Sequence, residues 1–173
     1  MRIGYGFDSH EFRAGIPLKI GGLTVLHDRG LGGHSDGDVL LHAITDALLG
    51  AIAAPDIGAL FPPSDAKWKN ADSAIFLREA LKRVSDAGYV LGNVDASLVL
   101  AAPKIGPHSA AIRARVAELL GVNPDCVGLK AKTPEGLNLD NTAIAHVVVL
   151  VEKLKHRPVR NRTKRSKRRT TAR

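Results

Sequence analysis

The sequence has very little cysteine, no long apolar run and, over its last twenty or so residues, no acidic side chain. Cys126 is the single cysteine among 173 residues, so no disulfide can form within the chain. Structural disulfides are typical of secreted proteins, and the N-terminus runs straight into a strand-like pattern without a secretion signal. We therefore expect a cytoplasmic location. No apolar stretch approaches the roughly 20 residues of a membrane-spanning helix, which argues against a membrane protein.

Positive charge is concentrated at the C-terminus. Eleven of the 25 Lys and Arg residues lie between Lys153 and Arg173, whereas all 17 acidic residues come earlier. The first 152 residues thus hold 14 basic against 17 acidic side chains and form a slightly acidic body. A basic stretch with nothing to bury is typical of a disordered extension. We predict one globular domain over residues 1–152 and a basic, disordered tail over residues 153–173.

Apolar periodicity predicts strands and helices in alternation along the globular part. The helices are expected at about 36–50, 72–87 and 107–120, and the strands at about 2–9, 17–26, 90–101, 126–132 and 144–152. This order favours an α/β sandwich, in which helices cover one face of a mixed or antiparallel sheet. The loops at 53–71 and 133–143 are long for so small a domain, and such loops often carry the chemistry.

The stretch GYGFDSHEF places an acid and a histidine two positions apart on the first predicted strand. Side chains alternate between the two faces of a strand, so Asp8 and His10 point the same way, with Cα atoms roughly 6.5–7 Å apart. Both could reach one ion. A half-exposed polar strand edge would carry the same letters, so a third residue is needed to decide.

His42 is the candidate for that third residue. In the helical stretch DGDVLLHAITDALLG, the polar residues Asp38, His42, Thr45 and Asp46 form a stripe opposite the apolar face. One interpretation is a surface histidine supported by acids at i−4 and i+4. With Asp8 and His10, however, two imidazoles and a carboxylate equal the ligand set of a catalytic zinc site with one open position. Asp38 or Asp46 could then orient the His42 ring.

Two further stretches have residues suited to phosphate. In GLGGHSDGD, glycines lead into a helix N-terminus, where His34 and Ser35 could donate hydrogen bonds to an anion. A flexible turn with Ser35 as helix cap explains the same residues. In KAKTPEGLN, Thr133 and Glu135 follow an apolar strand and would suit phosphate with a hard cation such as Mg²⁺ or Mn²⁺. A plain β-turn is the alternative.

Together these stretches resemble the family of 2-C-methyl-D-erythritol 2,4-cyclodiphosphate synthases. The motifs GYGFDSH, GGHSDGDVLLHAITDALLGA, DIGALFP, GYVLGNVD, APK and KAKTPEGL follow the family's order and spacing from residue 1 to about 152. The resemblance implies a ferredoxin-like or chorismate-mutase-like subunit with a four-stranded mixed sheet and a small hairpin. It also implies a homotrimer with active sites at the subunit interfaces, and conversion of 4-diphosphocytidyl-2-C-methyl-D-erythritol 2-phosphate to the cyclodiphosphate and CMP, a step of non-mevalonate isoprenoid synthesis.

The resemblance also implies roles for individual residues. Asp8, His10 and His42 would bind one Zn²⁺ per subunit, and Glu135 would contact a Mg²⁺ or Mn²⁺ that arrives with the substrate. His34 and Thr133 would stabilise the transition state. The implied substrate contacts are Asp8, Ser9, His10, His34, Ser35, Asp56, Ile57, Gly58, Phe61, Ser64, Asp65, Leu100, Ala101, Ala102, Pro103, Lys104, Ile105, Gly106, Lys132, Thr133, Pro134 and Glu135.

The sequence departs from the family at two places. Pro63 stands where the family usually has an aspartate that contacts the erythritol, and Ser64 or Asp65 could substitute for it. After the Thr133–Glu135 turn, the usual aromatic residue is Leu139 and the usual arginine is missing. Those residues border a cavity on the threefold axis in relatives, and we predict that this cavity cannot hold a diphosphate in the same way.

Nucleic-acid binding by the basic tail is the competing hypothesis. Eleven cations would give salt-dependent affinity for phosphates without regard to sequence. The tail has no aromatic residue to stack on bases, and the body is acidic. We therefore expect a small-molecule enzyme, with nucleic-acid binding as a side activity at most.

Overall fold

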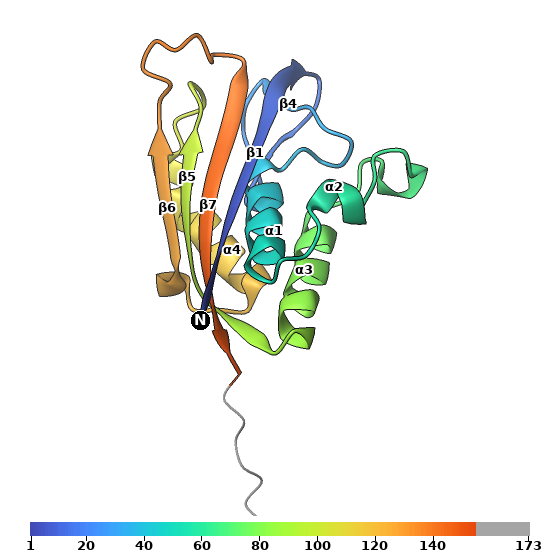
Figure 1. Ribbon diagram of the computed structural model, residues 1–173. Coiled ribbons are helices and arrows are strands. Elements are labelled where there is room, and N and C mark those ends of the chain that lie inside the picture. Colours follow the sequence, from blue (N-terminus) through green and yellow to red (C-terminus); the bar gives the residue numbers. More distant parts are fainter. Residues whose placement is uncertain (155–173) are drawn as a thin grey trace, which may run out of the picture.

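The computed structural model describes residues 1–154 and contains a mixed sheet with helices on one side (Figure 1). The five-stranded sheet has the order β4-β1-β7-β5-β6, formed by β1 (Arg2–Ala14), β4 (Arg29–Leu31), β5 (Tyr89–Val99), β6 (Val127–Lys132) and β7 (Thr142–Lys153). β5 and β6 are parallel, whereas β7 is antiparallel to both β1 and β5. The prediction of a mixed sheet with helices on one face is confirmed.

The sheet has one strand more than the predicted four. The additional strand, β4, comprises three residues that pair with the end of β1 at Phe12–Ala14. Three residues are too few to produce a readable alternation of apolar and polar side chains. The single strand predicted over 17–26 is two strands, β2 (Leu18–Ile20) and β3 (Leu23–Val25), joined at Gly21 and Gly22, both with positive φ. They form a hairpin separate from the main sheet, as the resemblance implies.

Three main helices cover the sheet: α1 (Val39–Ala51), α3 (Ala74–Asp86) and α4 (Ser109–Leu120). A short helix, α2 (Ile57–Leu60), lies within the predicted loop 53–71, and single 3-10 turns occupy Ala66–Trp68, Gly106–His108 and Pro124–Cys126. The expected helix cap at Ser35 is wrong, because Asp38 is the N-cap of α1 and accepts a hydrogen bond from the Leu41 N–H. None of the helices among residues 1–154 is long and apolar enough to cross a membrane.

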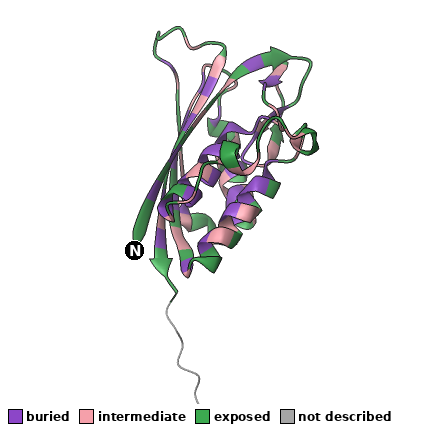
Figure 2. Ribbon diagram, turned by 45° about the vertical axis from the view of Figure 1, so that its right-hand side comes forward, coloured by how far each residue is buried: buried purple, intermediate pink, exposed green. Residues whose placement is uncertain are grey.

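Burial alternates along the central strands, as Figure 2 shows by colour. On β7 the odd-numbered residues from Ala143 to Val151 are buried against the helices. On β1 the even-numbered residues face the helices, whereas Ile3, Tyr5 and Phe7 are exposed on the opposite face. The core therefore lies between the sheet and the helices, and the other face of the sheet is apolar but uncovered.

Two glycines let α1 lie directly on β1. A Cβ atom at Gly4 would overlap the carbonyl oxygen of Ala47, and one at Gly6 would overlap the carbonyl oxygen of Ala43. Only glycine permits so close an approach of two backbones. This contact brings the side chains of α1 within reach of those on β1.

β7 continues through Lys153, the first residue that the sequence assigned to the tail. The rest of the predicted tail, residues 155–173, lies outside the described residues.

Candidate metal centre and active site

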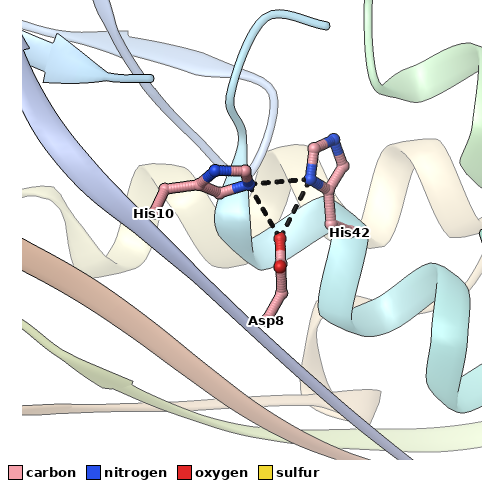
Figure 3. A group of neighbouring side chains, drawn as sticks. All are labelled: Asp8, His10 and His42. Carbon is pink, nitrogen blue, oxygen red and sulfur yellow. Dashed lines mark hydrogen bonds and ion pairs between the residues drawn. The ribbon is translucent and has the colours of Figure 1, made fainter. Parts of the chain in front are cut away.

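Asp8, His10 and His42 meet at one point between β1 and α1 (Figure 3). Asp8 and His10 point to the same face of β1, and His42 comes from the first turn of α1. Asp8 Oδ2 lies 2.9 Å from His10 Nε2 and 3.0 Å from His42 Nδ1. The two ring nitrogens lie 3.1 Å apart. The three donor atoms are thus mutual neighbours.

This arrangement fits a metal ion. Tetrahedral zinc with ligand distances of about 2.0 Å holds neighbouring ligand atoms roughly 3.3 Å apart, slightly more than the separations here. Two imidazole nitrogens and one carboxylate oxygen form a ligand set that zinc uses at catalytic centres, with a fourth position left for water or substrate. Asp8, His10 and His42 can therefore hold a metal.

Asp8 and His10 shift each other's pKa. Burial acts to raise the pKa of Asp8, but hydrogen bonds and charges of His10 and His42 outweigh it and hold the pKa of the carboxyl well below its usual range. Burial acts to lower the pKa of His10, whereas the hydrogen bond and charge of Asp8 raise it, so that the pKa of His10 lies above its ordinary value. Asp8 is therefore an anion at neutral pH, ready to attract a cation.

The predicted surroundings of His42 need correction. His42 is 8% exposed and Asp38 and Thr45 are fully buried, so α1 has no solvent-facing stripe at these positions. The carboxylate of Asp38 accepts the N–H groups of Gly21, Gly22 and Leu41, and thereby joins the β2–β3 hairpin to α1. Asp46 accepts the N–H of Ile57. Within residues 1–154 neither carboxylate forms a hydrogen bond or an ion pair with the His42 ring.

A cavity of about 180 Å³ adjoins the metal cluster. Its lining residues are His10, His34, Ser35, His42, Ile57, Gly58, Phe61, Pro63, Trp68 and Phe76. Nε2 of His34 is buried and has no hydrogen-bond partner among residues 1–154, which leaves it available to a ligand. The cavity thus brings His34, Ser35, Ile57, Gly58 and Phe61 together beside the metal ligands.

The predicted substrate contacts that do not line this cavity include Ser9, Asp56, Ser64 and Asp65. Ser9 is exposed on β1 between Asp8 and His10, and strand alternation directs it to the opposite face of the sheet. The Asp56 carboxylate caps α2 through the Ala59 N–H, and the Asp65 carboxylate binds Lys67 at 2.6 Å. Ser64 is exposed beside Pro63.

A second cavity, of about 460 Å³, lies at the other edge of the sheet beside β5 and β6. The predicted loop 100–106 contributes Leu100, Pro103, Lys104, Ile105 and Gly106 to its wall; Ala101 and Ala102 belong to the same loop. Lys132, Thr133 and Glu135 also line it, and the Thr133 hydroxyl donates a hydrogen bond to the Glu135 carboxylate next to Pro134. No residue lines both this cavity and the one beside the metal cluster.

A family model for the YgbB family matches residues 1–152. The chain belongs to the YgbB family. The 2-C-methyl-D-erythritol 2,4-cyclodiphosphate synthase of Koribacter versatilis (strain Ellin345) is 71% identical over 153 residues, which are 88% of this chain and 99% of that protein. The corresponding chloroplastic synthase of Oryza sativa subsp. japonica is 53% identical over 87% of this chain and 69% of that protein.

Solved structures agree with this assignment. A 2C-methyl-D-erythritol-2,4-cyclodiphosphate synthase described as a bound form with CDP is 43% identical to this chain, with a TM-score of 0.83, over 87% of this chain and the whole of that one. The family predicted from the six motifs is confirmed.

Sequence reasoning missed several residues at this YgbB-family site. Trp68 and Phe76 form an aromatic cluster with Phe61, with ring centroids 4.6–5.6 Å apart, on the wall beside His42. Trp68 is the single tryptophan in the chain, and its position in a long loop was the available signal. Ser73 and Asp36, which lie behind His42, carry no signal in the local pattern.

Proposed function

We propose that this protein is a 2-C-methyl-D-erythritol 2,4-cyclodiphosphate synthase of the non-mevalonate isoprenoid route. It would convert 4-diphosphocytidyl-2-C-methyl-D-erythritol 2-phosphate to 2-C-methyl-D-erythritol 2,4-cyclodiphosphate and CMP. The observation that carries the proposal is the cluster of Asp8, His10 and His42 in a member of the YgbB family. The named relatives support the choice of substrate.

The reaction needs positioning and charge stabilisation rather than a protein nucleophile. An oxygen of the substrate's 2-phosphate attacks the β-phosphorus, a new P–O–P link forms, and the bond to the CMP oxygen breaks in line. Zn²⁺ held by Asp8, His10 and His42 would supply Lewis-acid polarisation of a phosphoryl oxygen. His34 and Ser35, on the wall of the adjoining cavity, would donate hydrogen bonds to the phosphate next to it.

The second cavity would take the cytidine part of the substrate. The loop 100–106 would contact the base through backbone groups, while Lys132 and Thr133, which also line the cavity, would contact the phosphates. Glu135 would contact Mg²⁺ or Mn²⁺ bound with the diphosphate, because hard cations prefer carboxylate oxygens. A relative described as bound to CDP supports a cytidine-diphosphate ligand.

We further propose a homotrimer in which each active site uses two protomers. The metal cluster and the cytidine cavity lie at opposite edges of one sheet and share no lining residue. One substrate would therefore bridge the metal cluster of one protomer and the cytidine cavity of the next. The uncovered apolar face of the sheet, with Ile3, Tyr5, Phe7 and Val148 exposed, supplies a surface for this association.

CMP release tests the proposed activity. Purified protein with Zn²⁺, Mg²⁺ and the substrate should release CMP, and His42→Ala or Asp8→Asn should reduce the rate by at least about 100-fold because each removes a metal ligand. Asp125→Asn makes the same chemical change at an exposed position and should keep the full rate. CMP release that persists in metal-free protein would contradict the proposal.

Three predictions remain beside the main one. A cytoplasmic location stays a prediction, as does the division into a domain over residues 1–152 and a basic tail over 153–173. Nucleic-acid binding by the tail can be separated from catalysis by deleting residues 155–173, which should leave CMP release intact while any retention of DNA or RNA disappears.

A further inference from the structure

The edge of the His42 ring that faces away from the metal cluster also has partners. Nδ1 of His42 faces Asp8 and His10, so Nε2 points to the other side. There Nε2 lies 2.8 Å from the hydroxyl oxygen of Ser73 and 3.0 Å from that of Ser35. An imidazole that binds a metal through Nδ1 carries its proton on Nε2, so Nε2 is a donor and needs an acceptor.

Ser73 is the better acceptor, because its own proton is already committed. The Ser73 hydroxyl lies in short hydrogen-bond contact with Asp36 Oδ1, and a carboxylate can only accept. The hydroxyl proton therefore goes to Asp36, and a lone pair of the Ser73 oxygen faces the His42 N–H. The three groups therefore form a hydrogen-bond relay with one direction: His42 donates to Ser73, and Ser73 donates to Asp36.

Asp36 is fixed in position as the final acceptor of this hydrogen-bond relay. Its backbone N–H donates to the carbonyl of Ala71 at 3.0 Å, and its side chain is only 11% exposed. Oδ2 of Asp36 forms an ion pair with the ammonium of Lys19, at 3.4 Å. The carboxylate is thereby fixed behind Ser73 by contacts from two other parts of the chain.

Within the described residues, the Ser73 hydroxyl has no other structural role. Ser73 is fully buried and precedes the first residue of α3, yet its side chain makes no capping hydrogen bond to that helix. Ser35, by contrast, lines the cavity and lies 3.5 Å from Ser73. Ser35 is therefore free to turn its proton toward a ligand.

We propose that Ser73 and Asp36 are positioning residues of the metal site. They hold the His42 ring and keep its proton on Nε2, so that the lone pair of Nδ1 points to the metal. The inference rests on the proposed metal site and adds that the stretch ADS at residues 71–73 contributes to metal affinity without contacting the metal. Hydrogen-bonded groups behind a metal-binding histidine commonly contribute 10- to 100-fold to affinity.

Zinc affinity measured by competition with a chromophoric chelator tests this on the full-length, metal-free protein. Ser73→Ala is expected to weaken Zn²⁺ binding about 10- to 100-fold. Asp36→Asn should also weaken it, and the double variant should bind no more weakly than Ser73→Ala, because both residues act through one path. The visible absorption bands of bound Co²⁺ should shift in Ser73→Ala, since the orientation of one ligand ring changes.

Ser35→Ala is the matched control, because it deletes the same atom at nearly the same distance from Nε2. It should keep zinc affinity within about twofold of wild type. Thermal unfolding followed by circular dichroism checks that the variants fold, and if Ser73→Ala does not, Asp36→Asn, which preserves side-chain shape, carries the test.

Wild-type zinc affinity in Ser73→Ala, or in Asp36→Asn, would overturn the inference, as would a loss in Ser35→Ala equal to that in Ser73→Ala. A different result would overturn the proposed metal site itself: equal zinc binding by wild type and His42→Ala. The two failures are therefore distinguishable, and neither measurement depends on turnover.

Discussion

At the scale of single residues, Asp8 is the group on which the candidate metal centre depends. It lies on a strand next to two histidines, and their hydrogen bonds hold the pKa of its carboxyl well below the usual range. In return, Asp8 holds the pKa of His10 above the ordinary value. The same contacts that prepare the carboxylate for a cation therefore also make protons compete for His10.

The raised pKa of His10 predicts how zinc binding depends on pH. A protonated imidazole cannot bind a metal, so zinc must displace a proton whenever the pH is below the pKa of His10. Zinc affinity should therefore be level above that pKa and fall by about tenfold per pH unit below it. Because the pKa is raised, the fall should begin above pH 6.5, the ordinary histidine value.

Chelator competition between pH 5.5 and 8.5 measures this dependence. His10→Gln removes the titrating ring, and its weaker residual affinity should vary less steeply over the same range. Wild-type affinity that stays level down to pH 5.5 would contradict the prediction.

At the scale of elements, the close contact of β1 with α1 decides whether the metal ligands meet. Asp8 and His10 belong to β1 and His42 to α1, so the distance between the two backbones sets the distances between ligand atoms. Gly4 and Gly6 allow that contact, because a side chain at either would overlap a carbonyl of α1. The glycines of GYGFDSH are thus part of the metal site although they bind nothing.

Gly6→Ala is expected to separate β1 from α1. Overpacking of this kind typically costs about 1–3 kcal/mol in the free energy of unfolding, and zinc affinity should fall with it because His42 moves away from Asp8. Gly50→Ala, on α1, is the control. A Cβ atom at Gly50 would make an ordinary 3.6 Å contact with the Tyr5 carbonyl oxygen.

Gly50→Ala should leave zinc affinity unchanged and stabilise the protein by up to about 1 kcal/mol, since alanine favours the helix. Chemical denaturation and zinc titration of both variants give the two quantities. Equal stability and equal zinc affinity for Gly6→Ala and wild type would show that the backbones can separate without consequence.

At the scale of the whole molecule, the outer face of the sheet is the feature that the single chain leaves uncovered. Ile3, Tyr5 and Phe7 on β1 and Val148 on β7 are 44–68% exposed, while the opposite face of the same strands is buried. His146 lies among them, hydrogen-bonded to Tyr5 and in edge contact with Phe7. The proposed trimer would bury this face and bring the two separate cavities together.

Phe7→Asp is expected to dissociate the proposed trimer, because it places a charge in the apolar contact. CMP release should fall at least about tenfold in the dissociated protein, while zinc affinity should persist, since the metal ligands lie on the other face of β1. Analytical ultracentrifugation, with CMP release and zinc titration on the same samples, separates these effects.

Ile75→Asp, on the half-exposed surface of α3, makes a comparable change away from the sheet and should preserve both the oligomer and turnover. A wild-type protein that sediments as a monomer at working concentration and still turns over at full rate would refute the two-protomer site.

The sequence by itself determined the features of the protein that depend on residues close together along the chain. Strand periodicity places Asp8 and His10 on one face, apolar patterning predicts the three main helices, and the ordered motifs identify the family. The first two follow from local rules, because residues two to four positions apart meet whatever the rest of the fold does. β4 was missed because three residues do not establish a period.

Tertiary structure alone decided the contacts between distant segments. It placed His42 in a buried position against Asp8, which is 34 residues away, and Ser73 behind His42 at a separation of 31 residues. It also assigned Asp38 to the hairpin rather than to His42, and separated the cytidine cavity from the metal cluster. Such contacts depend on how α1 and α3 pack on the sheet, and packing of distant elements leaves no trace in local periodicity.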